Sequence, residues 1–392
     1  MKNIAAVLFL LSVCFFASAQ KLDWNISYDY QFSNYEYDAS HDRYDPSYTL
    51  HASRLTPEIG VIVKQDKNIF HRVRAGIDIF KDMGTGSQNL DLFHEILVYY
   101  DLEAAFSNGG SLEALAGIFP RRYTKGDYIG PFFDDDRYFT DNNLEGMLFK
   151  YSNKHIYAEL GLDWLGKLGD KYTPLRRERF QVLTAGSWDF ARTLSLDWTG
   201  SLYHFACSPL LPNVVDNGMV YPRIKWAPET ALETLWIDAG GLFTYQNDRH
   251  TGAGPVFPMG FLSRQRIGKW HFSLDNRVYF GDDLMPLYDA SYEGVPYASD
   301  LYFGDQAFHT LHGGPSWADF LSLVYEPQLT KWLSVSVRLT FKFGEPYKAI
   351  DVPVFRGWEQ TASLKISFDA LRQSPKAKAR RSLFEGLQRY AL

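Results

Sequence analysis

The sequence predicts an all-β protein, a transmembrane antiparallel up-and-down β-barrel of about 16 strands. Three observations lead to this prediction: an export signal at the N-terminus, alternating polar and apolar residues along strand-length segments, and short turn signals that alternate with longer polar segments. Aromatic residues make up 16% of the chain. No segment after residue 20 is apolar for the roughly 20 residues that a membrane-spanning helix needs. Amphipathic strands are therefore the remaining way for this chain to cross a membrane.

The first residues have the layout of a secretory signal peptide. Lys2 supplies a positive charge, residues 5–17 form an uncharged apolar stretch, and Ala17-Ser18-Ala19 fits the small-x-small cleavage rule. A lipoprotein signal ending at Cys14 is the alternative, but the valine before this cysteine does not suit that signal. We therefore expect residues 1–19 to be removed on export.

Apolar and polar residues alternate with a period of two along the whole chain. In residues 156–164, Ile, Ala, Leu, Leu and Trp alternate with Tyr, Glu, Gly and Asp, and residues 333–343 repeat the pattern. A soluble β-sandwich or propeller would alternate in the same way. Tryptophans at the ends of the apolar faces, however, are typical of the aromatic girdles of a membrane barrel. These tryptophans are Trp24, Trp164, Trp188, Trp270, Trp332 and Trp358.

The connections between these segments are of two kinds. Short turn signals lie near residues 66–69, 107–110, 152–154, 190–192, 228–231, 267–269 and 328–331. Longer polar segments lie near residues 36–47, 81–91, 120–142, 166–177, 206–219, 247–254, 282–315 and 344–355. Because the two kinds alternate, they separate sixteen strands, as a barrel with short periplasmic turns and long extracellular loops requires. We expect the barrel to span residues 20–369 and a basic periplasmic tail to span residues 370–392.

The strand pattern also assigns side chains to the inside of the barrel. Because the apolar set must face lipid, the alternate set faces the lumen. Charges of both signs would be costly in a dry core, whereas a barrel of about 16 strands is wide enough to hold an aqueous channel. The predicted lumen-lining residues are Arg72, Arg74, Asp78, Glu159, Asp163, Arg177, Arg179, Asp197, Asp238, Asp275, Arg277, Arg338 and Lys342.

The chain resembles a known group of barrels. The segments that are similar in layout to phosphate-selective-porin-like proteins are Gly-Ile-Phe-Pro at 117–120, Leu-Glu-Gly at 144–146, Lys-Tyr at 150–151 and Asp-Trp at 163–164. With the export signal and the closing strand 358–368, the mature chain resembles Gram-negative outer-membrane barrels of Bacteroidetes-type bacteria. The resemblance implies a porin-like fold in the outer membrane. Porins usually end on an aromatic residue of the last strand, whereas here Phe368 is followed by the basic tail.

The third long loop, near residues 120–142, is the candidate constriction. In general porins the third extracellular loop folds into the lumen and narrows it. If this loop does so, its acidic residues face the arginines of the wall, and the resulting field would select solutes by charge. An ordinary surface loop is the alternative. The candidate constriction residues are Arg121, Arg122, Asp134, Asp135, Asp136 and Arg137.

Neither a metal nor a cofactor is expected. The acidic run at 134–136, with Asp141, could offer oxygen ligands to Ca²⁺, but its spacing is that of a solvated acidic run. His309, His312 and Asp305 could bind Zn²⁺, although two histidines three residues apart in a loop are a weak indication. The basic residues at 176–179 could guide anions or pair with acids of the neighbouring strand.

These features predict a porin-like channel for passive or weakly selective passage of small polar or charged solutes. A non-conducting barrel that assists envelope assembly or polysaccharide export is one alternative, and an outer-membrane hydrolase is the other. Catalysis is not expected, because no histidine has a serine and an acid at a triad spacing. The expected partners are outer-membrane lipid and lipopolysaccharide, small polar solutes and further copies of the chain in a homo-oligomer. The net charge of −6 argues against nucleic acid.

Overall fold

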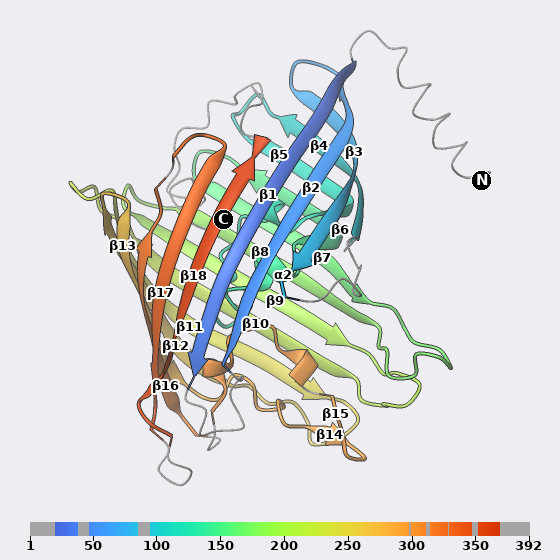
Figure 1. Cartoon of the computed structure of the whole chain (residues 1–392), viewed down its shortest axis with the longest axis vertical. Coiled ribbons are helices and arrows are strands. Elements are labelled where there is room, and N and C mark those ends of the chain that lie inside the picture. Colours follow the sequence, from blue (N-terminus) through green and yellow to red (C-terminus); the bar gives the residue numbers. More distant parts are fainter. Residues whose placement is uncertain are drawn as a thin grey trace.

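Sixteen strands form one closed antiparallel barrel (Figure 1). The computed structural model describes residues 20–37, 47–84, 95–297, 299–310, 314–327, 329–346 and 352–368. The predicted signal peptide (1–19) and basic tail (370–392) lie outside the described residues. The predicted fold class and strand number are confirmed.

Strands of 10 to 18 residues build the barrel, which is long enough for tilted strands to cross a bilayer. They are β1 (Gln20–Tyr37), β2 (Tyr48–Lys64), β3 (Ile69–Asp82), β4 (Glu95–Ala105), β5 (Ser111–Pro120), β6 (Asn143–Ser152), β7 (Ile156–Gly166), β8 (Arg179–Asp189), β9 (Leu194–Phe205), β10 (Val215–Trp226), β11 (Thr234–Asp248), β12 (Met259–Lys269), β13 (Phe272–Gly281), β16 (Ser316–Tyr325), β17 (Leu333–Gly344) and β18 (Phe355–Ser367).

Short elements lie in two of the loops. They are η1 (Arg121–Tyr123), α2 (Arg137–Thr140), β14 (Ser291–Tyr292), β15 (Val295–Pro296), η2 (Ser299–Leu301) and η3 (Gln306–Phe308). No helix in the described ranges is long and apolar enough to span a membrane.

The barrel closes because its first and last strands pair. β1 pairs with β18 from Ser27 opposite Ser367 to Tyr37 opposite Gly357, and it pairs with β2 on its other side. Seven short connections lie at one end of the barrel, called the turn end below, and eight longer connections lie at the other, the loop end. This alternation agrees with the turns and loops expected from the sequence.

Side chains alternate between the lumen and the outer surface. In β1, Asp23 and Asn25 are buried inside the barrel, whereas Trp24 and Ile26 between them are exposed on its outside. A soluble sandwich would bury the apolar set instead. The exposed apolar bands and buried polar rows are therefore the arrangement of a barrel whose solvent is lipid.

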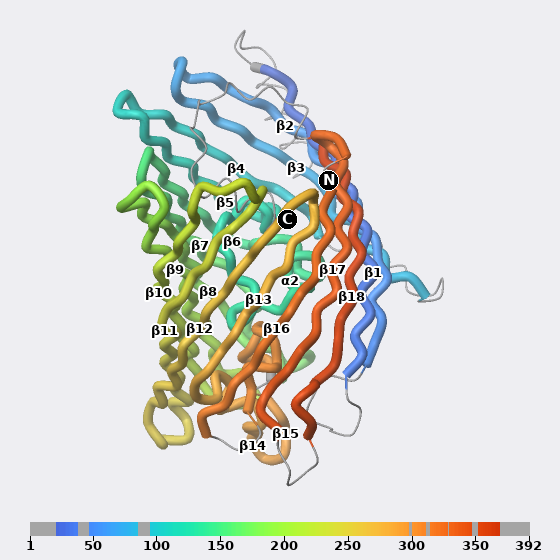
Figure 2. The backbone as a smooth tube through the Cα atoms, turned by 90° about the vertical axis from the view of Figure 1, so that its left-hand side faces the viewer, coloured from blue at the N-terminus to red at the C-terminus, as the bar shows by residue number. Residues whose placement is uncertain are grey.

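Two loops fold back into the barrel. The third loop (residues 121–142) carries α2, which lies within the outline of the barrel in both views (Figures 1 and 2). The seventh loop (residues 282–315) packs against it, and Phe133 of the third loop and Phe308 of the seventh are fully buried in one apolar cluster with wall residues of β8 to β16. The lumen is thus narrowed at this level by packed side chains.

The alternation of faces can be tested on neighbouring residues of β17. Val337 is exposed on the outer surface, and Ser336 lines the lumen cavity described below. We expect Val337→Arg to lower the free energy of unfolding by about 2–4 kcal/mol, because a charged side chain near the bilayer midplane must be desolvated. Ser336→Arg should cost much less. Urea unfolding in phospholipid vesicles measures both, and equal costs would contradict the assignment of the two faces.

Candidate lumen site

Two glycines stand where the third loop leaves and rejoins the wall. Gly117 of β5 lies directly opposite Gly146 of β6, and both have a positive φ, of 126° and 158°. A Cβ atom at Gly117 would lie 2.2 Å from the carbonyl oxygen of Val98, and one at Gly146 would lie 2.1 Å from that of Leu162. Glycine is therefore required at both positions for the strands to pack this closely.

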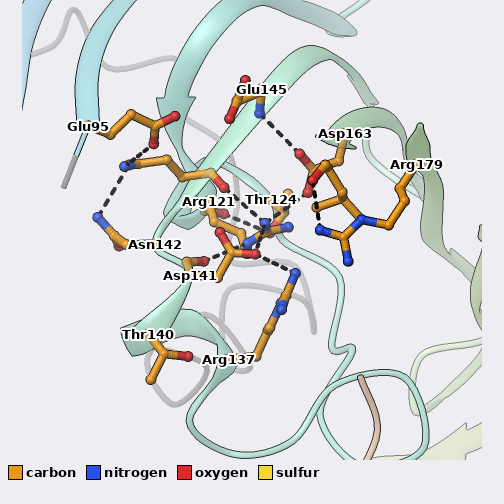
Figure 3. Close-up of polar contacts among 12 residues, drawn as sticks. Glu95, Arg121, Thr124, Arg137, Thr140, Asp141, Asn142, Glu145, Asp163 and Arg179 are labelled. Carbon is orange, nitrogen blue, oxygen red and sulfur yellow. Dashed lines mark hydrogen bonds and ion pairs between the residues drawn. The ribbon is translucent and has the colours of Figure 1, made fainter. Parts of the chain in front are cut away.

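Arg121 fastens the start of the third loop to the wall (Figure 3). One of its terminal nitrogens donates to Asp163 Oδ2 of β7 at 2.8 Å and to Asp141 Oδ2 at 3.1 Å. The Arg121 side chain is fully buried. Arg137 of α2 also pairs with Asp141. Because a buried guanidinium needs compensating charge, these contacts hold both ends of the loop together.

Glu159 of β7 receives the next part of the loop. Its two carboxylate oxygens accept hydrogen bonds from the backbone N–H groups of Lys125 and Gly126, both at 2.7 Å, and from the hydroxyl of Tyr128 at 2.9 Å. Asp127 then reaches another part of the wall, five strands away from β7, where Arg264 of β12 donates to it at 2.5 Å. The loop is thus tied to two distant parts of the wall.

The three consecutive aspartates of the loop have different surroundings. Asp136 accepts a hydrogen bond of 2.6 Å from Gln31 and another from Tyr35, both on β1. Asp135 faces Arg277 of β13 at 3.8 Å and lines the cavity. The backbone N–H of Asp134 donates to the carbonyl oxygen of Phe303 in the seventh loop.

Arg122 and Arg137, the remaining candidate constriction residues, also lie inside the barrel. Arg122 pairs with Glu58 of β2 at 3.2 Å. The guanidinium of Arg137 lies over the ring of Phe303, 4.1 Å from its centroid. Both contacts therefore contribute to docking the third loop, one against the wall and the other against the seventh loop.

Most of the predicted lumen residues form ion pairs within the barrel. These contacts are Arg72 with Asp101, Arg74 with Asp23, Asp78 with Arg54, Asp238 with Arg223 and Arg264, Asp275 with Arg266 and Arg338, and Lys342 with Asp305 and Glu359. Asp197 instead accepts hydrogen bonds from Ser187 and Ser195.

Arg177 and Arg179 lie at the loop end, and Arg179 is drawn in the same close-up as Asp163 and Arg121 (Figure 3). Arg177 precedes β8, and its guanidinium donates to the carbonyl oxygens of Ala206 and Asn213 and lies 4.2 Å from the ring centroid of Phe205. Arg179 begins β8 and donates to the carbonyl oxygen of Leu165. These contacts brace neighbouring loops.

A cavity of about 1020 Å³ lies between the third loop and the turn end. Ten basic and six acidic side chains line it. The basic ones are Arg54, Arg122, Lys125, Arg223, Arg264, Arg266, Arg277, Lys331, Arg338 and Lys365, and the acidic ones are Asp29, Asp127, Asp135, Glu233, Asp275 and Glu326. Basic side chains thus outnumber acidic ones on the cavity surface, and the carboxylates of Glu58, Asp78 and Asp238 behind it pair with four of these arginines.

Several residues of the site could not be found by strand-pattern reasoning. Arg264 and Asp127 are 137 residues apart in the sequence, and no local motif marks either of them. Asp101, Glu103 and Glu113 bring three carboxylates together within metal-ligand spacing, but Arg72 and Lys150 already pair with them. The lumen-facing period is the only signal that could have suggested these residues.

The residues of the two possible metal sites, for Zn²⁺ in the seventh loop and for Ca²⁺ in the third, have protein partners where the structure describes them. Asp305 binds Lys342, and the imidazole Nδ1 of His309 lies 3.1 Å from Asp283, so the two residues are held by different partners. His312 lies outside the described residues. Asp141, the fourth residue of the acidic set, pairs with Arg121 and Arg137.

The N-terminal part of this chain matches a protein-family model. A model of the lipid A 3'-O-deacylase-type family matches residues 16–202, just under half of the chain. This is a family of enzymes, so the expectation that the chain is not an enzyme is wrong. In a barrel, side chains that are distant in sequence meet across strands, so a catalytic set need not form a local triad motif. No curated protein matches the sequence.

Solved outer-membrane proteins share the fold. A loop L8 deletion mutant of OmpT from Vibrio cholerae is 10% identical, with 89% of this chain and 100% of that chain covered and a TM-score of 0.51. OmpT of the same organism, folded in vitro, is 9% identical, with 90% of this chain and 98% of that chain covered and a TM-score of 0.50. An anion-selective porin from Comamonas acidovorans is 12% identical, with 89% of this chain and 100% of that chain covered and a TM-score of 0.49. The chain is an outer-membrane β-barrel with a porin-like fold.

The docked third loop should respond to pH through Asp134. The Asp134 side chain is exposed, but desolvation by the protein around it, together with the nearby carboxylates of Asp136 and Asp305, raises its pKa from 3.8 to about 7. Because the docked loop holds this proton more tightly than an undocked loop, docking is favoured at low pH and loses that contribution as the pH rises through about 7.

Hydrogen–deuterium exchange of residues 127–140, corrected for the intrinsic rate, measures this effect. We expect exchange to rise severalfold between pH 5.5 and 8.5 in the unaltered chain. In Asp134→Asn the rise should be much smaller, because the amide cannot ionise. The same pH dependence in both proteins would exclude Asp134 as its source.

Proposed function

We propose that the barrel passes small anionic solutes through a lumen that the third loop narrows. The observation that carries this proposal is the excess of basic side chains around the cavity below the loop. Arg277 and Arg338 lie 3.8 and 3.5 Å from their nearest carboxylates, which are longer separations than those of the Arg264 pairs. Their guanidinium groups are therefore the ones best able to exchange a protein carboxylate for a solute.

By the general rule for these barrels, the turn end faces the periplasm and the loop end faces outside. With that orientation, the cavity extends from the third loop toward the periplasm. A solute crossing the membrane would pass the third loop beside Asp135, which lies across from Arg277. Asp135 is the acidic residue of the 134–136 run that lines the cavity, so it is the one expected to influence selectivity.

The test is the reversal potential of the full-length chain in planar bilayers under a KCl gradient. We expect preference for anions, lowered about twofold or more in Arg277→Gln/Arg338→Gln and raised in Asp135→Asn, with the largest changes at low salt, where screening is weakest. Arg192→Gln is the matched control, because Arg192 is an exposed arginine at the turn end that pairs with Glu229. Folded protein that never conducts would overturn the channel proposal.

A second function is favoured by the family match over residues 16–202. We propose that the chain also hydrolyses an acyl ester of a lipid A-type glycolipid in the outer leaflet. Such a reaction needs a base that activates water close to the headgroups. His51 of β2 lies toward the loop end on the outer surface, with its Nε2 2.6 Å from the hydroxyl of Tyr30. We assign His51 as this base.

The chain offers a matched control for this assignment. His71 of β3 also contacts a tyrosine hydroxyl at 2.6 Å, that of Tyr100, but it lies near the turn end. Incubation of the full-length chain with lipid A should release an acyl chain, detected as a mass loss. His51→Asn should slow this release by about 100-fold or more, whereas His71→Asn should not. Equal rates in both variants would exclude His51, and no mass loss with the unaltered chain would exclude the hydrolase.

A further inference from the structure

Charged side chains gather on the outer surface of the barrel where β9, β10 and β11 reach the loop end. His204 of β9 lies opposite Asp216 of β10, and its Nδ1 is 2.8 Å from Asp216 Oδ1. Arg249, which follows β11, donates from Nε to Asp216 Oδ2 at 2.7 Å. Tyr203 and Phe205, on either side of His204, are buried in a cluster inside the barrel. His204 therefore points outward, toward lipid.

This cluster marks the level of the lipid headgroups. Charged side chains on the lipid face are costly at the bilayer midplane, and the cost nearly vanishes at the interface. Aromatic rings continue the row around the barrel: Trp164 stacks on Phe180 at 5.8 Å, and Phe180 lies 5.0 Å from the ring of His204. Aromatic rings at this level form the girdle typical of a membrane interface.

Two loops extend beyond this level. The fourth loop (residues 167–178) and the fifth loop (residues 206–214) are joined by a hydrogen bond from Leu210 N–H to the carbonyl oxygen of Pro174. They form the green loops that reach past the strand ends at the lower right of Figure 1. We call their exposed side chains the brim. Its members are Lys167, Leu168, Lys171, Tyr172, Leu175, Arg176 and Leu210.

The two loops of the brim carry both apolar and basic exposed side chains. Leu168, Leu175 and Leu210 are 50–59% exposed, and Tyr172 is 79% exposed. Large apolar side chains gathered on a loop surface indicate an interaction site. The three basic residues outnumber the exposed carboxylate of the fourth loop, Asp170. An amphipathic, cationic surface that continues the membrane-facing wall matches lipid with anionic headgroups.

We propose that the brim, with Arg249 below it, docks a phosphorylated glycolipid of the outer leaflet. The lysines and arginines would contact its phosphates, while the leucines and the Trp164–Phe180 pair would contact its acyl chains. The brim follows β7 and β9, whereas His51 lies on β2, on another part of the wall. The docking site is therefore separate from the proposed hydrolytic residue, and it does not depend on conduction through the lumen.

Binding can be measured on the full-length chain in detergent by native mass spectrometry with bisphosphorylated lipid A. The brim variant is Lys167→Ser/Lys171→Ser/Arg176→Ser. The control variant is Lys154→Ser/Arg192→Ser/Lys269→Ser, which removes three exposed cations from the turn end. We expect the brim variant to bind about tenfold or more weakly, the control to bind as the unaltered chain does, and dephosphorylated lipid A to bind weakly to all three.

A second variant separates the apolar contribution from the charge. Leu168→Ser/Leu175→Ser should weaken binding at both low and high salt, whereas the loss in the basic variant should shrink at high salt because of screening. Equal binding by the brim and control variants, or equal binding of both forms of lipid A, would overturn the proposal. Acyl release and conductance, measured on the same variants, should be unchanged, so failure of either proposed function is distinguishable from failure of the docking site.

Discussion

Closure of the sheet is the constraint on which the rest of this structure depends. In lipid, no water is present to satisfy backbone N–H and C=O groups, so a sheet with a free edge could not span the membrane. Pairing of β1 with β18 removes that edge. The pairing also fixes which residues of every strand face inward, because a shift of one residue in register would exchange the two faces.

The closed wall in turn determines how charge is held in the lumen. Arg54 and Asp78 are both fully buried, and Arg54 also donates to the carbonyl oxygen of Phe139 in the third loop. An isolated charge in that position would carry a large desolvation penalty. The third loop therefore supplies hydrogen-bond partners to charged side chains of the wall as well as narrowing the lumen. Moving the loop would uncover several charges at once, which couples its position to the electrostatics of the cavity.

Much of the wall could be predicted from the sequence, because strand faces depend on neighbours along the chain. The segment 156–164 shows this, since its alternation alone assigned Glu159 and Asp163 to the inside. The partners of these residues could not be predicted. Glu159 meets the backbone of residues 125–126, and Asp163 meets Arg121, only after the third loop has docked.

The packing of the seventh loop could be predicted from the sequence even less than the partners of Glu159 and Asp163. Its sequence has the composition of a surface loop, yet Phe308 is fully buried against wall residues of strands far away in sequence. Its burial depends on the space that the third loop leaves, which no local pattern encodes. The match to an enzyme family was missed for a related reason. Side chains of a barrel meet across strands, so a catalytic set need not appear at a fixed spacing along the chain.

The two faces of the wall would allow both proposed activities in one chain. In β2, Arg54 points into the lumen, while His51, three positions earlier, lies on the outer surface. Solute selection would act through the inward set and lipid chemistry through the outward set. Because alternate residues belong to different faces, a substitution in one set changes the local charge of one compartment and leaves the side chains of the other in place. The alternation of side chains that builds the barrel therefore also keeps the lumen-facing residues separate from the lipid-facing residues.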